Sequence, residues 1–198
     1  MIHLDYVTKL YYRGREQVLA FETGKLDFGA GEFVALVGPS GSGKTTLLSM
    51  LGGMLAPSSG HVYVGGQSIY DLSVSARAEL RRDRLGFVFQ SFNLVPYLTA
   101  MENVQLPLFL AGRPRDEQQR VASELLERLG LEKRLHHRPS ELSAGQQQRV
   151  ALARTLANEP SIILADEPTG NLDPDSREIA MSFLRELHKR GRTIVMVT

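Results

Sequence analysis

The sequence lacks cysteine, and it has neither a long apolar run nor a strong excess of charge of one sign. Without cysteine there is no disulfide and no thiolate metal site, which is compatible with a reducing compartment. No apolar run approaches the ~18 residues that span a bilayer, and the opening MIHLDYVTKL lacks a signal-peptide pattern. A formal net charge of +1 gives no reason to expect nucleic acid as a partner. We therefore expect a soluble, cytoplasmic chain that reaches a membrane only through a partner and does not insert into it.

The composition is that of a globular protein, 42% hydrophobic and 23% charged over 198 residues, which suffices for one domain with a buried core. Loose alternation over the first thirty residues predicts antiparallel strands joined by a turn. Uninterrupted apolar runs at 33–37, 161–166 and 193–198 predict buried strands, the first of them covered on both faces of a sheet.

Helical spacing follows these runs and also fills the middle of the chain. We predict helices after residue 43, over 116–130, from 144 with Ser143 as the N-cap, and over 175–191. Together, these predicted strands and helices indicate an α/β core interrupted by a mostly helical insert. The expected apolar faces are Val121, Leu125 and Leu129 in the second helix and Ile179, Phe183 and Leu187 in the last.

Residues 38–45, GPSGSGKT, match the pattern G-x-x-x-x-G-K-[ST] between an apolar strand and a helix. Glycines let successive backbone N–H groups surround a phosphate, and the following helix directs its positive end at the same anion. Lys44 can reach β- and γ-phosphate oxygens, and the Thr45 hydroxyl can bind Mg²⁺. We call residues 38–45 the phosphate cradle. The nucleotide contacts predicted here are Gly38, Pro39, Ser40, Gly41, Ser42, Gly43, Lys44, Thr45 and Thr46.

Two adjacent carboxylates end the apolar run at 161–166. Asp166 lies where the ligands of open α/β sheets gather and can join a magnesium shell, while Glu167 can polarise a water in line with a γ-phosphate. Taken alone, the pair is better interpreted as a surface acidic pair closing a strand; with the cradle present, the catalytic interpretation is favoured. A GTPase is disfavoured, because none of the asparagines (93, 103, 158, 171) is followed by lysine.

The segment LSAGQQQR, residues 142–149, carries no nucleophile or paired carboxylates, only a serine and a glycine at a helix N-terminus, which is an anion site. Together with the cradle, ILADEP (163–168) and NLD (171–173), it closely resembles the signature of ATP-binding cassette (ABC) ATPases. The resemblance covers essentially the whole chain. It implies a P-loop NTPase fold with a mainly parallel sheet, an N-terminal antiparallel β subdomain and an inserted α-helical subdomain. The implied division is 1–91 with 159–198 for the nucleotide core and 92–158 for the helical part.

The resemblance also implies roles for single residues. In this family the signature segment (142–149) contacts ATP held by the opposite subunit, here through Ser143, Gly145 and Gln146, so that two chains enclose two Mg-ATP. Gln90 matches a glutamine that touches Mg²⁺ or water, which makes Thr45, Gln90 and Asp166 the expected metal contacts and Glu167, Lys44 and Gln90 the expected catalytic groups. Asp173 matches an aspartate at the dimer interface, and Tyr11 an aromatic that stacks on adenine, with Tyr12 as the alternative.

Further stretches, including YLTAMENV (97–104) and ILADEPTGNLD (163–173), resemble those of the ATPases of lipoprotein-releasing, macrolide-exporting and cell-division complexes. This implies a homodimer or pseudo-dimer on an integral membrane permease, peripheral at the cytoplasmic face of the inner or plasma membrane, with YLTAMENV near the partner. The alternative is an ATP-dependent regulatory module that signals through a membrane protein without transport. A soluble DNA-repair or translation ABC protein is disfavoured, because no coiled-coil, zinc or second-cassette insertion is seen.

Two positions depart from the family pattern. Ala144 stands where the signature usually has its first glycine, for which we expect at most modest weakening. The family places a switch histidine directly after the strand that here ends at Thr198, and His136 and His137 lie in the wrong place to substitute for it. We expect the chain as given to be truncated after Thr198, and to bind ATP but hydrolyse it poorly.

Overall fold

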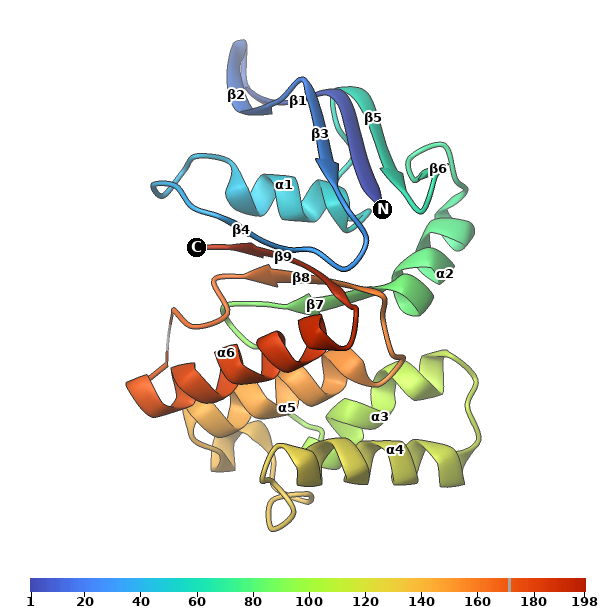
Figure 1. The fold of residues 1–198 in the computed structure, drawn as a ribbon, viewed down its shortest axis with the longest axis vertical. Coiled ribbons are helices and arrows are strands. Elements are labelled where there is room, and N and C mark those ends of the chain that lie inside the picture. Colours follow the sequence, from blue (N-terminus) through green and yellow to red (C-terminus); the bar gives the residue numbers. More distant parts are fainter. Residues whose placement is uncertain (171) are drawn as a thin grey trace.

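The computed structural model describes residues 1–170 and 172–198, and its elements stack in layers (Figure 1). An antiparallel sheet lies at one end, and α1 (Lys44–Leu51) separates it from a parallel sheet. The helices of the second half of the chain lie beyond that sheet. Because α1 is short and lies between two sheets, its leucines are buried while its first turn is left open at the cradle. None of the helices in this described part is long and apolar enough to cross a bilayer.

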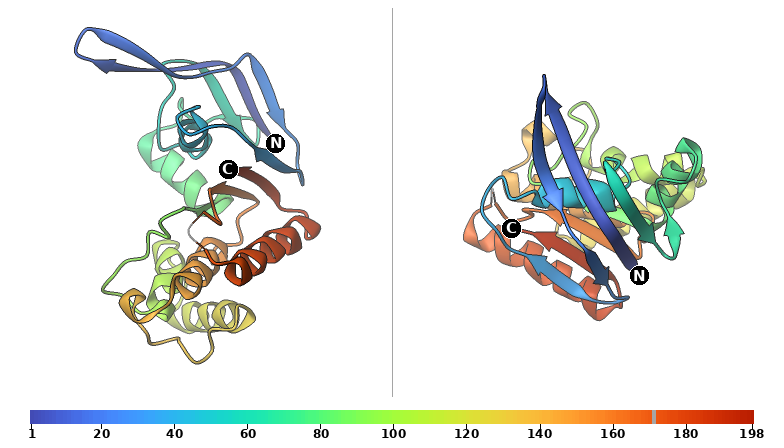
Figure 2. Two further views of the ribbon diagram at one scale, coloured as in Figure 1. Left: turned by 90° about the vertical axis from the view of Figure 1, so that its left-hand side faces the viewer. Right: turned by 90° about the horizontal axis from the view of Figure 1, so that it is seen from above.

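The antiparallel sheet is formed by the N-terminal third of the chain, as the alternation predicts. Its strands follow the order β2-β1-β5-β6, and β3 also pairs with β1. Figure 2 shows the hairpin of the first two strands extending past the rest of the molecule. The strands are β1 (Ile2–Arg13), β2 (Glu16–Glu22), β3 (Lys25–Phe28), β5 (Ser59–Val64) and β6 (Gln67–Ser68).

The parallel sheet has the order β4-β9-β8-β7, so all of its strands end at the same edge. In β8 and β9 alternate residues enter two different cores, as expected for strands covered on both faces. Ile162 and Leu164 face α1 and the antiparallel sheet, whereas Ile163 and Ala165 face the helices. The strands are β4 (Phe33–Leu36), β7 (Leu85–Val88), β8 (Ile162–Asp166) and β9 (Thr193–Val197).

The helices beyond the parallel sheet share one hydrophobic core with it. Figure 1 shows α5 and α6 next to the sheet, with α3 and α4 beyond α5. Because α3 and α4 pack on α5 rather than on the sheet, α5 is the element that joins them to the strands. These helices are α3 (Ala100–Leu110), α4 (Arg115–Arg128), α5 (Ala144–Leu156) and α6 (Pro174–Lys189), with a 3₁₀ turn at Pro139–Glu141. Helix α2 (Val74–Arg84) lies beside the sheets instead, and its Leu80 belongs to the core shared with α1 and the antiparallel sheet.

Two sequence predictions about burial are wrong. The run 33–37 is not covered on both faces: β4 ends at Leu36, Ala35 is exposed, and Val37 is 80% exposed. The reason is that β4 lies at the edge of the sheet, next to β9 only among the described strands. In α6, Phe183 and Leu187 are buried but Ile179 is 41% exposed, because the buried face of the helix begins at Ala180 and leaves Ile179 at its border.

Candidate active site

The phosphate cradle follows β4 and ends within the first turn of α1, at Thr45. Gly41 and Gly43 have φ values of 81° and 85°, which favour glycine. A Cβ at Gly43 would lie 2.2 Å from the carbonyl oxygen of Ala20, because β2 passes directly over the loop. Gly43 is therefore required twice, by its dihedral angle and by the close approach of β2.

Lys44 folds back over the cradle. Its Nζ donates hydrogen bonds to the carbonyl oxygens of Gly38 (2.5 Å) and Pro39 (2.9 Å). A lysine donates to neutral carbonyl oxygens where no anion is present. A charged phosphate oxygen is a stronger acceptor for its ammonium group. The Lys44 ammonium group therefore already lies at the place where phosphate would bind.

A cavity of about 290 Å³ opens beside this loop. It brings together the cradle, the first turn of α1, strand β2 and one of the two predicted carboxylates. Pro39 and Ser42, which the sequence places among the contacts, do not line it, and neither do Gly38 and Asp166. The lining residues are Val18, Leu19, Ala20, Ser40, Gly41, Gly43, Lys44, Thr45, Thr46 and Glu167.

Asp166 is the last residue of β8, and Glu167 follows it. Both lie at the sheet edge at which β4 ends and the cradle begins. The Thr45 hydroxyl donates a hydrogen bond of 3.1 Å to Asp166 Oδ1, joining two residues 121 positions apart. Burial raises the pKa of Asp166, the Thr45 hydrogen bond opposes that rise, and the neighbouring Glu167 adds to it. Glu167 adopts a left-handed φ of 42° and donates its N–H to Val197 O (3.0 Å), which orients its side chain into the cavity.

These residues fit a divalent cation of the magnesium type. A hydroxyl and a carboxylate already in contact supply hard oxygen ligands, and a partly buried carboxylate with a raised pKa is stabilised by a nearby cation. The described residues contain no group of three or more His, Cys, Asp or Glu able to hold a metal ion. That is the pattern expected when phosphate oxygens and water complete the shell, because Mg²⁺ at phosphate sites uses only one or two carboxylates.

Gln90 is exposed just beyond β7, at the same sheet edge. It does not line the cavity, but it lies close to Glu167: a Cβ at Gly170 would be 3.3 Å from Gln90 Nε2 and 3.5 Å from Glu167 Oε2. The structure thus brings the predicted glutamine and the predicted general base to one small region around Gly170.

The signature segment begins α5 but lies outside the cavity. Ser143 is the N-cap, as predicted: its Oγ accepts from Gln146 N (3.3 Å), and its N–H donates to Gln146 Oε1 (2.9 Å), forming a capping box. Ser143 and Ala144 are exposed, so their helix N-terminus is accessible. The first turn of α5 does not serve the cradle of its own chain.

Gly145 has a packing role that the sequence did not reveal. It is buried, and an added Cβ would lie 2.1 Å from Ser176 Oγ and 2.9 Å from Ser176 Cβ on α6. The absence of a side chain therefore allows the first turns of α5 and α6 to touch, in addition to leaving the helix end bare.

Asp173 also has a local role that sequence reasoning missed. Its Oδ1 accepts the N–H of Ser176 (2.9 Å) as the N-cap of α6, and this hydrogen bond holds the pKa of Asp173 below its usual value. Asp-Pro at the start of an apolar-periodic segment is a helix-start signal that could have found it. Asn171, the first residue of the NLD motif, lies outside the described residues.

Tyr11 and Tyr12 are both exposed on β1 and do not line the cavity. The register places Tyr11 opposite Val18, a lining residue, and Tyr12 opposite Gln17. Residues directly opposite one another in an antiparallel pair project to the same face. Val18 and its neighbour Leu19 both line the cavity but project to opposite faces of β2, so each tyrosine shares a face with one lining residue and the register does not choose between them.

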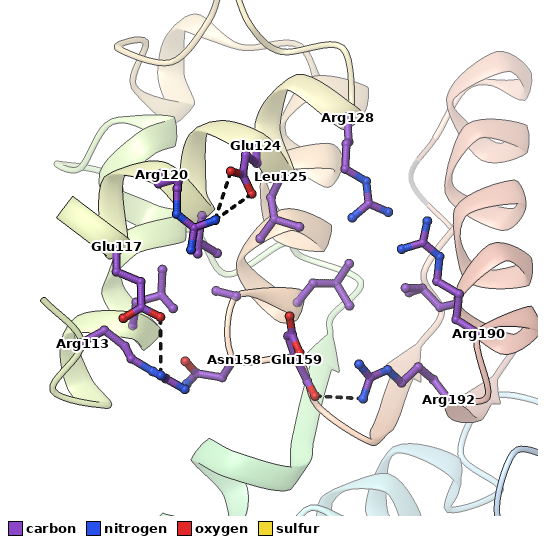
Figure 3. Close-up of a pocket in the computed structure, with 15 residues that line it drawn as sticks. Arg113, Glu117, Arg120, Glu124, Leu125, Arg128, Asn158, Glu159, Arg190 and Arg192 are labelled. Atoms are coloured by element: carbon purple, nitrogen blue, oxygen red, sulfur yellow. Dashed lines mark hydrogen bonds and ion pairs between the residues drawn. The ribbon is translucent and has the colours of Figure 1, made fainter. Parts of the chain in front are cut away.

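A second cavity, of about 340 Å³, lies between α4 and the ends of α5 and α6 (Figure 3). Its arginines already have partners: Arg120 pairs with Glu124 (3.1 Å), and Arg192 donates to Glu159 O (3.0 Å). Glu159 and Arg192 immediately precede β8 and β9, so this cavity is at the sheet edge opposite the cradle. None of the predicted site residues lines it, and it is not a candidate nucleotide site.

Comparison with known proteins gives matches over the whole chain. A family model described as ABC transporter matches residues 21–170. An uncharacterized ABC transporter ATP-binding protein of Thermotoga maritima is 50% identical, over 97% of this chain and 82% of that protein. The macrolide export ATP-binding/permease protein MacB of Pectobacterium atrosepticum is 47% identical over the full chain, which spans 30% of that protein.

Solved structures agree in fold. The dimeric post-hydrolysis structure of the ATP-binding cassette MJ0796, bound to ADP and Pi, has a TM-score of 0.94 and 46% identity, and covers 100% of this chain and 88% of that one. MJ0796 is from Methanocaldococcus jannaschii. This likeness confirms the predicted α/β class with a mainly parallel sheet, an N-terminal antiparallel sheet and a helical insert.

Proposed function

Because this chain belongs to the ABC transporter family as its ATP-binding ATPase subunit, we propose how its residues perform that activity. The observation that carries the proposal is the meeting of two distant chain segments, residues 44–45 and 166–167, at one sheet edge. The Thr45 hydroxyl touches Asp166, and Lys44 and Glu167 line the same cavity. Segments more than 100 residues apart thus place a phosphate-binding loop, a metal-binding pair and a general base together.

ATP is held by the cradle. The backbone N–H groups of residues 38–45 surround the β-phosphate, and Lys44 exchanges its two carbonyl partners for phosphate oxygens. Tyr11 stacks on the adenine from the hairpin, on the face that it shares with Val18. In a partly closed cavity the attraction between the Lys44 ammonium group and phosphate is stronger than in open water. It stabilises the bound triphosphate and the charge that develops during hydrolysis.

Thr45 and Asp166 would hold Mg²⁺, with Gln90 as a contact directly or through water. When bound, the ion would neutralise negative charge on the phosphates. The chain's own contribution is to fix the ligand oxygens: the hydrogen bond between Thr45 and Asp166 sets their spacing before any ligand arrives.

Glu167 acts as the general base. Its backbone is fixed by Val197 and by the left-handed turn, so that its carboxylate projects into the cavity beside the cradle. A carboxylate within hydrogen-bond reach of a water takes the proton as that water attacks the γ-phosphorus. Gln90, close to Glu167, positions the same water.

The site is completed by a second copy of the chain. Ser143, Gly145 and Gln146 begin an accessible helix that does not line the cavity of its own chain, which is the arrangement expected if they contact the phosphates held by a partner. Asp173 lies beside Gly145 and so reaches the same interface. The solved relative MJ0796 is a dimer.

The proposed setting is the cytoplasmic face of a membrane, where the dimer drives an integral permease. Residues 92–158 form the helical part that faces the permease, and 1–91 with 159–198 form the nucleotide core. MacB is named as an export ATP-binding/permease protein, which favours transport over the regulatory alternative.

The test is Glu167→Gln in the full-length protein, with Glu127→Gln, exposed on α4, as the matched control. We expect ATP affinity to stay near the wild-type value, turnover to fall by ~100-fold or more, and an ATP-bound dimer to accumulate in light scattering. The control should behave as wild type. A Glu167→Gln variant that stays monomeric at saturating Mg-ATP contradicts the shared site, and one that turns over normally contradicts the general base.

A further inference from the structure

The segment that follows Gln90 has an unusual backbone. Phe92 and Asn93 adopt φ values of 58° and 49°, two consecutive non-glycine residues in the left-handed region. Side chains disfavour this conformation, and it persists only where the surroundings hold it. Because Phe92 lies two residues beyond Gln90, whatever holds this turn also sets the position of the Gln90 side chain.

Arg154 holds it. Its Nη1 donates to Asn93 O (2.5 Å) and its Nη2 donates to Phe92 O (2.7 Å), so the planar guanidinium bridges the carbonyl oxygens of both strained residues. A single fork of donors with fixed spacing is suited to such a pair of acceptors.

The environment of Arg154 is costly for a cation. Burial lowers the pKa of its guanidinium, and none of the ion pairs among the described residues involves it. A buried charge without a counter-ion is destabilising unless hydrogen bonds compensate. The carbonyl oxygens of Phe92 and Asn93 supply this compensation, which makes the contact with the turn specific to arginine rather than incidental packing.

Arg154 belongs to the helix that also carries the signature segment. It lies eleven residues after Ser143 on α5, about 16 Å along the helix. The next residue, Thr155, donates to Phe87 O (2.5 Å) at the end of β7. One helix therefore presents its first turn to the dimer interface and grips both the strand before Gln90 and the turn after it.

We propose that Arg154 is the positioning residue for Gln90: by clamping the Phe92–Asn93 turn to α5, it sets the glutamine side chain beside Glu167 and makes that setting follow displacements of the signature helix. This rests on the proposed ATPase mechanism. It assigns Arg154 no contact with ATP, so ATP affinity should not depend on it.

The experiment compares Arg154→Ala with Arg81→Ala in the full-length protein. Arg81, on α2, is a matched control outside the nucleotide site and the signature segment: its guanidinium is also partly buried and donates to a backbone carbonyl, that of Gly53 (3.0 Å), but not to the turn after Gln90. For Arg154→Ala we expect kcat to fall about tenfold or more, since a 1 Å misplacement can cost up to about 100-fold, with KM and ATP affinity near wild type. Millimolar guanidinium chloride, but not equal sodium chloride, should restore part of the lost kcat.

Amide hydrogen exchange gives a readout that does not require turnover. In the nucleotide-free protein, Arg154→Ala should speed exchange at residues 91–95, and Arg81→Ala should not. Equal kcat losses in the two variants without guanidinium rescue, or unchanged exchange at 91–95, would overturn the proposal and leave Arg154 a packing residue. If wild-type protein binds ATP but never turns it over, the catalytic mechanism fails instead, and the exchange result alone decides whether Arg154 holds the turn.

Discussion

Replacing Gly145 by alanine separates two explanations for the glycine in the signature segment. One is that a bare helix end is needed for a phosphate of the partner's ATP. The other follows from the fold: an added Cβ would lie 2.1 Å from Ser176 Oγ and 2.9 Å from Ser176 Cβ in the same chain. We expect Gly145→Ala to destabilise the isolated subunit, before any nucleotide or partner is involved.

The magnitude follows from the contacts. Rotation about χ1 of Ser176 can remove the hydroxyl from the new methyl group, but it cannot move the Cβ, which stays well inside the ~3.5–4.0 Å of an ordinary carbon–carbon contact. The first turns of α5 and α6 must therefore move apart, and overpacking of this kind costs ~1–3 kcal/mol. Alanine regains at most ~1 kcal/mol over glycine through helix propensity. A net loss of ~1–2 kcal/mol in the free energy of unfolding is expected.

The assay is urea unfolding without nucleotide, run as a double-mutant cycle with Ser176→Gly. Ser176→Gly removes both obstructing atoms, so Gly145→Ala should cost less in that background, with a coupling energy of ~1 kcal/mol. Ala144→Gly, at the exposed neighbouring position, is the control; it should lose ~0.5–1 kcal/mol through backbone entropy and show no coupling to Ser176. If Gly145→Ala is as stable as wild type but loses ATP-dependent dimerisation, the packing argument is refuted and the phosphate alone explains the glycine.

Three further predictions concern the nucleotide site and the dimer. Ser143→Arg should block ATP-dependent dimerisation in light scattering while ATP affinity is unchanged; lost affinity would mean that Ser143 serves its own chain. Asp166 has a raised pKa in the folded chain, so the magnesium-free protein loses stability as pH rises above 3.8 and through that raised pKa. Asp166→Asn should therefore be the more stable protein in thermal melts at neutral pH, with the gain disappearing below pH 3.8, and Mg-ATP should no longer stabilise it normally. Tyr11→Ala should weaken ATP binding by about 1–2 kcal/mol in calorimetry, as expected for a lost stacking contact, and Tyr12→Ala should not.

The part of the fold that could be predicted from sequence is the part encoded by neighbouring residues. The cradle, its flanking strand and helix, and the Ser143 cap are each specified within about ten positions, so local spacing and side-chain chemistry suffice to identify them. The edge position of β4 was not predictable in this way. An apolar run has the same composition at the edge and in the middle of a sheet, and only the strand order shows which it is.

Contacts between distant segments account for the rest of what the sequence left out. Nothing near Gly145 indicates that Ser176, 31 positions later, occupies the space of its missing side chain. In the same way, Arg154 reads as one more basic residue on an amphipathic helix, and its bonds to Phe92 and Asn93 appear only when α5 is packed under β7. Asp173 is different, because its capping role is encoded locally: Asp173 followed by Pro174 is a helix-start signal that the sequence itself contains.

The two roles of Asp173 need not compete. As the N-cap of α6 it is held at a fixed angle beside Gly145, and a side chain that is already ordered loses little entropy when a partner's atoms reach it. The same holds for Ser143, which the capping box fixes before any nucleotide arrives. Both helix ends are therefore pre-organised on the surface of the subunit. In the dimer proposed above they contact ATP held by another chain, and closure of that interface displaces α5. Since Arg154 and Thr155 bind α5 to the backbone on both sides of Gln90, closure of the interface and alignment of the hydrolytic site are one event in this proposed mechanism.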